Sequence, residues 1–145
     1  MHYTEEECVS AIDLTTELIN RRTEDCTEYT CGTNDCVALL VEYDRALRGD
    51  RSRADLPFTW NGPVEFIYNL RRSGYTAAQY LEHCGYTIVN NKRPLVGDVS
   101  FTGGALIAGP KGWITTTETN EGVTVAKQLM FFEPKMSIIA RPIKD

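Results

Sequence analysis

The segment 34–49 reads Asn-Asp-Cys-Val-Ala-Leu-Leu-Val-Glu-Tyr-Asp-Arg-Ala-Leu-Arg-Gly and predicts the central helix of the fold. Asn34 and Asp35 are residue types that cap helix N-termini, and Gly49 is of the type that ends helices. The apolar residues between them recur with helical spacing and cover a wide face: Val37, Leu39, Leu40, Val41, Tyr43 and Leu47. We therefore expect a helix over about 35–48, with Cys36 in its first turn.

Three further helices are predicted around this one. Thr4-Glu5-Glu6-Glu7 is a capping box that opens a helix ending near residue 22. Asn61-Gly62-Pro63 places proline in the first turn of another helix, which ends at Ser73-Gly74. Thr76-Ala77-Ala78-Gln79 repeats the capping box and opens a short helix that ends at Cys84-Gly85. The charged segment 50–55 between the second and third helices is typical of a solvated connection.

Beyond residue 85 the pattern changes to short β-branched or aromatic runs separated by Gly, Pro and Asn turns. These runs are 86–89, 98–101, 105–108, 113–117, 123–129 and 137–141. Helices followed by an antiparallel sheet make an α+β fold, and a chain of 145 residues is long enough for one domain over 1–145.

Composition limits the function further. The chain has 42% apolar and 24% charged residues, and 15 Lys plus Arg against 20 Asp plus Glu give a net charge of −5. This is the composition of a globular protein, and its acidity disfavours binding to a nucleic-acid backbone, which depends on clustered Lys and Arg. We expect no membrane span, because no window approaches the roughly 18 apolar residues that one requires. The acidic segment 1–7 also lacks the features of a signal peptide.

Five cysteines are present, namely Cys8, Cys26, Cys31, Cys36 and Cys84. An odd number without a secretion signal argues against a complete disulfide framework. Cys36 differs from the others, because free N–H groups and the helix dipole favour a thiolate in the first turn of a helix. Such a thiolate is a nucleophile once a base is near. The alternative is a small apolar residue buried at a helix start.

A cysteine that opens a long helix before an antiparallel sheet is the layout of papain-like hydrolases. The later segment Gly97-Asp98-Val99-Ser100-Phe101 strengthens the comparison. The chain resembles the NlpC/P60 superfamily of cysteine peptidases, and especially the small phage-encoded relatives found among tail assembly genes. The matching elements are 32–36, 62–70 and 97–99, so the resemblance covers roughly residues 30–110. It implies a papain-like core with Cys36 as the nucleophile.

The chain differs from active members of this family because it lacks the histidine that serves as general base. In active members a histidine begins the strand after the Gly-Asp strand, but the corresponding segment 103–109 contains none. The only histidines are His2, at a terminus, and His83, in the short helix beside Cys84. His83 is the candidate base, and the alternative is an ordinary residue at a helix end. Without a base in reach a cysteine protease lacks its proton acceptor, so the resemblance favours the fold over the activity.

The other cysteines and the glycine turns fit known metal, disulfide and phosphate sites poorly. Cys26, Cys31 and Cys36 are five residues apart, whereas structural zinc sites use pairs with shorter spacers. A Cys26–Cys31 disulfide would require an oxidising compartment. The glycine-containing segments 103–104 and 109–112 lack the strand-to-helix context of a phosphate loop. We therefore expect no metal and no cofactor.

The sequence predicts a virion-associated phage protein of this fold, structural or assembly-related, in the tail or its attachment region. Its expected partners are other virion proteins, including further copies of itself, and it would reach the virion from the host cytoplasm where it is made. The alternative is an active cysteine peptidase or amidase that cleaves peptidoglycan stem peptides, with Cys36 as the nucleophile and His83 or an unusual base assisting. A third hypothesis is a small host-interacting phage protein that acts through its acidic surface.

Overall fold

A computed structural model describes residues 1–25, 36–54, 63–89, 93–101, 105–116, 123–127 and 138–144. The helices in these ranges are α1 (Glu5–Asp25), α2 (Cys36–Arg48), α3 (Pro63–Arg72) and α4 (Ala77–His83), with the 3₁₀ turn η1 (Gly49–Arg51) after α2. Both predicted capping boxes are confirmed. The Thr4 hydroxyl accepts from the Glu7 N–H at 3.1 Å, and the Thr76 hydroxyl accepts from the Gln79 N–H at the same distance.

The sheet of the described residues has six strands in the order β1-β6-β2-β3-β4-β5. The strands are β1 (Tyr86–Ile88), β2 (Val99–Phe101), β3 (Ala105–Gly109), β4 (Gly112–Thr116), β5 (Val123–Lys127) and β6 (Ile139–Pro142). All neighbouring strands are antiparallel. The predicted α+β class is therefore confirmed, and β6 departs from a simple meander because it lies between β1 and β2.

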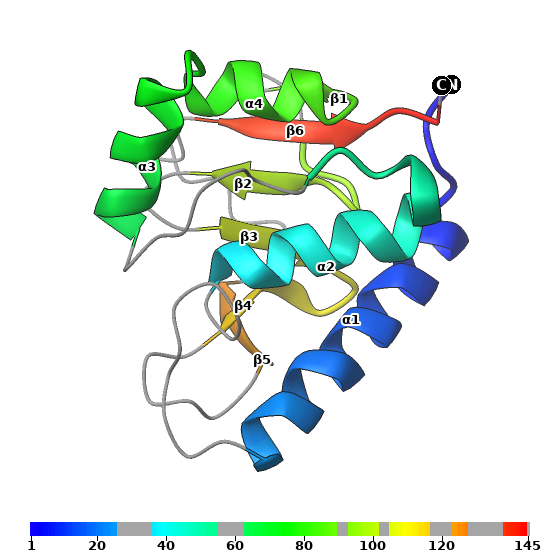
Figure 1. Ribbon diagram of the computed structural model, residues 1–145. Helices are drawn as coiled ribbons and strands as arrows, with labels where there is room; N and C mark the ends of the chain where they lie inside the picture. The colour runs from blue at the N-terminus through cyan, green and yellow to red at the C-terminus, as the bar shows by residue number, and fades with distance from the viewer. Residues whose placement is uncertain are drawn as a thin grey trace.

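Successive side chains along the central strands point to opposite faces of the sheet, and both faces are buried. Val99, Ile107 and Ile114 point to the face that carries α2, which packs against β3 and β4 with α1 beside it (Figure 1). Ala108 and Trp113 lie opposite each other on the other face, in a smaller apolar cluster. This period of two is what a pleated strand imposes. It explains why the sequence runs read as almost continuously apolar.

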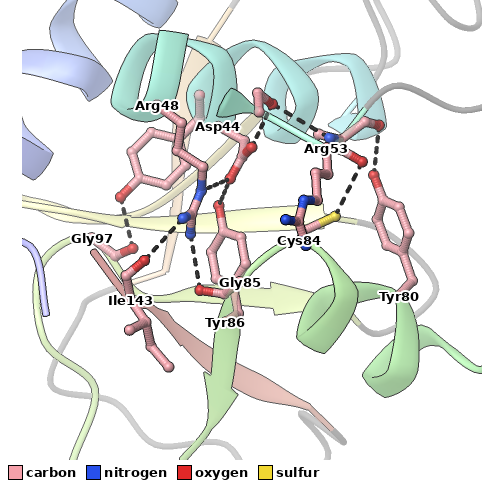
Figure 2. A network of polar contacts seen from close by, with 12 residues as sticks. Asp44, Arg48, Arg53, Tyr80, Cys84, Gly85, Tyr86, Gly97 and Ile143 are labelled. Carbon is pink, nitrogen blue, oxygen red and sulfur yellow. Dashed lines mark hydrogen bonds and ion pairs between the residues drawn. The ribbon is translucent and has the colours of Figure 1, made fainter. Parts of the chain in front are cut away.

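A buried ion pair joins α2 to the rest of the fold (Figure 2). Arg48 Nε donates to Asp44 Oδ1 at 2.9 Å, and these side chains are 7% and 1% exposed. The two terminal nitrogens of Arg48 donate to the carbonyls of Gly85 and Ile143, each at 2.9 Å. The Tyr86 hydroxyl donates to Asp44 at 2.8 Å. Burial is the largest influence on the pKa of Arg48 and lowers it, but the hydrogen bond to Asp44 and the negative charge of Asp44 together raise the pKa overall.

We expect Arg48→Met to lower the free energy of unfolding by about 3–5 kcal/mol, because it leaves the Asp44 carboxylate buried without a cation. Arg48→Lys should cost less, because the charge remains although the fork of hydrogen bonds is lost. The measurement is urea denaturation. The control is Glu17→Gln, which removes a surface ion pair with Arg21 whose side chains are 62% and 67% exposed, and should cost less than about 1 kcal/mol. Equal losses in R48M and E17Q would contradict the structural importance of the buried pair.

Candidate functional site

Cys36 is the first residue of α2 and so lies in its first turn, as the sequence predicts. The first turn of α2 lies over the end of the sheet where β2 finishes and β3 begins (Figure 1). The residues before it, 31–35, lie outside the described part of the chain. The nucleophilic role of Cys36 therefore stays a prediction that rests on its position in the helix.

The Gly-Asp pair forms the turn that leads into β2. Gly97 has φ +98°, a conformation that favours glycine, and its carbonyl accepts from the Tyr43 hydroxyl of α2 at 2.8 Å. Asp98 is 1% exposed and accepts from the Leu95 N–H at 2.8 Å. The Gly97-Asp98 pair therefore builds the turn before β2, and its hydrogen bond with Tyr43 holds this turn against α2.

Asp98 also pairs with β6 through Arg141. The guanidinium donates to both carboxylate oxygens, at 2.8 Å and 2.9 Å, which is the bidentate geometry that makes such pairs strong. This hydrogen bonding raises the pKa of Arg141. The pair therefore ties the start of β2 to a strand more than 40 residues later in the chain.

The position where the resemblance places a histidine is occupied by the start of β3. Ala105 is the first residue of this strand, is 1% exposed and pairs with Phe101 of β2. Its carbonyl accepts from the Thr115 hydroxyl of β4 at 3.1 Å. The described strand 105–109 contains no histidine, so its inner face supplies packing atoms and no proton acceptor.

Both histidines lie at the other end of α2. His83 is the exposed last residue of α4, two positions before Gly85, whose carbonyl binds Arg48. His2 forms an isolated bridge with Ile143, whose carbonyl also binds Arg48. Because a helix rises 1.5 Å per residue, the two ends of α2 are roughly 18 Å apart. The structure does not bring His83 to Cys36, and its role as a base stays a prediction.

Two of the remaining cysteines are described, and both are free and buried. Burial raises the pKa of the Cys8 thiol, and it raises that of Cys84 to about 12. Both thiols are therefore packed in the protein interior. Cys26 and Cys31 lie outside the described residues, as do the proposed zinc and disulfide arrangements built on them. Among the described residues, no group of three or more His, Cys, Asp and Glu side chains is placed to hold a metal ion.

A charged cavity that the sequence did not reveal lies at the Arg48 end of α2. It has a volume of about 490 Å³, and it is lined by Arg48, Asp50, Arg51, Ser52, Arg53, His83, Cys84, Gly85 and Ile143. The only signal in the sequence was the pair of arginines in the charged segment 50–55, which is equally typical of a solvated loop. The cavity forms because three distant segments converge on Arg48.

Comparison with models of protein families, with curated proteins and with solved structures found no match to this chain. In the parts of the chain that the structure describes, no helix combines the length and the apolar character needed to cross a membrane.

We expect Gly97→Ala to destabilise the fold by about 2–4 kcal/mol, because the new methyl group would meet the Cys8 side chain and its φ is strained. The matched control is Gly74→Ala. Gly74 has nearly the same φ, +97°, but an added methyl group there meets nothing within 4 Å. It should cost only the backbone strain, about 1 kcal/mol. Urea denaturation measures both, and equal losses would show that the close approach to Cys8 is unimportant.

We expect Cys8 and Cys84 to resist iodoacetamide in the native protein at pH 7 and to react in urea, because the thiolate is the reacting form. Peptide mass spectrometry measures the labelling. The Cys84 pKa is raised from 9.0 to about 12, so its stabilising contribution is complete below pH 9 and is lost as pH rises toward 12. Cys84→Ala should therefore reduce the fall in stability above pH 9. Fast native labelling of Cys84 would contradict its burial.

Proposed function

We propose that the chain is a papain-like domain of the NlpC/P60 type that serves as a structural or assembly protein of a phage virion, in the tail or its attachment region. The fold is supported by the arrangement of α2, which begins at Cys36 and packs on β3, and by the Gly97-Asp98 turn into β2. The phage context rests on the resemblance in the sequence.

The observation that carries the proposed loss of catalysis is the start of β3. A papain-like hydrolase requires an imidazole close to the cysteine at the helix start. Here the strand begins with the buried Ala105, while His2 and His83 lie near Arg48, at the far end of α2. With both histidines at the far end of α2, we assign Cys36 no imidazole as proton acceptor. The proposed role is therefore one of binding, with other virion proteins and further copies of the chain as partners.

We expect Cys36→Ala to leave incorporation into virions unchanged, because the proposed role makes no use of the thiol. The measurement is mass spectrometry of gradient-purified phage particles that carry the wild-type or the C36A gene. Gly97→Ala is the control for a change that acts through the fold, and it should reduce incorporation. Absence of the wild-type chain from purified particles would overturn the proposal.

The alternative is a cysteine amidase or peptidase that cleaves peptidoglycan stem peptides. It is favoured by one observation, the position of Cys36 at the first residue of a 13-residue helix, where a thiolate is stabilised. Purified protein should then release peptides from cell walls, and Cys36→Ala should abolish the release. Hydrolysis that depends on Cys36 would establish this alternative in place of a purely structural role.

A further inference from the structure

The cavity beside Arg48 has the size and lining of a site for a small anion. Its volume of about 490 Å³ is within the range of small-molecule sites. Among the described residues that line it are three arginines and a single acidic residue, Asp50. In a chain with a net charge of −5, this local excess of guanidinium groups is unusual.

Arg48 supplies a rigid base for this cavity. Its guanidinium is held by Asp44, by the carbonyls of Gly85 and Ile143, and between two aromatic rings. The guanidinium carbon is 5.5 Å from the ring centre of Tyr3 and 5.3 Å from that of Tyr86. Because Asp44 already neutralises Arg48, we assign the added attraction for an external anion first to Arg53.

Arg53 is the cation best placed to bind a ligand. The exposed Arg53 follows η1 and lines the cavity, and its carbonyl accepts a long hydrogen bond from the Cys84 thiol at 3.8 Å (Figure 2). Its guanidinium has no hydrogen bond or ion pair with any residue in the described ranges. Arg51 lines the same cavity from η1, and the exposed His83 adds ring nitrogens from α4.

Two helices, α2 and α4, end at this cavity, and arginines near helix C-termini are also found where they balance the helix dipole. That role is already filled at the end of α2 by Arg48, which is 7% exposed. Arg53 lies outside both helices and is exposed, so the dipole of α2 does not account for it. An oxyanion would give its guanidinium the planar, two-point partner that this group prefers.

We propose that this cavity binds a small organic anion, whose phosphate or carboxylate group is held by Arg53 and Arg51. The rest of the ligand would lie against Ser52, His83 and Gly85. The proposal is independent of the function of Cys36, because the cavity lies at the opposite end of α2.

The test is titration of the ¹⁵N-labelled full chain with inorganic phosphate and with acetate, with sodium chloride at matched ionic strength as the reference. We expect saturable shifts of the Arg53, Cys84 and Gly85 amide signals with at least one oxyanion, and its identity tells a phosphate site from a carboxylate site. Arg53→Gln should weaken binding about fivefold or more, because it removes a charge-assisted contact. The same change at an exposed arginine in the last turn of α3, Arg71→Gln, should leave the affinity within about twofold.

Shifts that fail to saturate with either oxyanion would overturn the proposal. So would equal weakening by R53Q and R71Q, because that result would indicate attraction to the overall charge rather than a site. Arg53→Gln keeps the backbone carbonyl that binds Cys84, so a loss of binding in this variant does not require a loss of folding.

Discussion

The ion pair between Asp44 and Arg48 is the contact on which the arrangement of the other elements depends. Its partners come from the loop after α2, from the start of β1 and from the C-terminal segment, through Ser52, Tyr86 and Ile143. A charge that is 1% exposed is tolerated only when its hydrogen bonds are complete. All three segments therefore have to contact the Asp44–Arg48 pair for its hydrogen bonds to be complete.

This constraint also sets the direction of α2 across the sheet. Its last turn is held at the start of β1, and Tyr43 holds the middle of the helix to the turn before β2. The first turn consequently falls at the opposite end, where β3 begins. The fold thus separates the cysteine at the start of the helix from the arginine cavity at its end. The two can differ in function because the ends of α2 are roughly 18 Å apart.

The sequence predicted local structure well because local signals were strong. The caps at Thr4 and Thr76 and the wide apolar face of 37–47 gave helices close to those observed. The strand runs were also located to within a few residues. The strand order was not predictable, because the insertion of β6 between β1 and β2 depends on non-local contacts such as the bidentate pair of Asp98 and Arg141. The position of Cys36 is local and was predicted, whereas the arginine cavity requires that non-local arrangement.

The packing around Ala105 shows why a base at this position would involve more than one substitution. Its side chain is 1% exposed, and it pairs with Phe101, whose ring stacks on Phe66 of α3 with centroids 5.2 Å apart. An imidazole in place of the methyl group would displace these rings, and its two nitrogens would need partners in an apolar core. At the start of β3, the side chain of Ala105 therefore contributes to the apolar core of the proposed papain-like fold. A change that introduced a histidine here would also have to enlarge the space between β2 and α3.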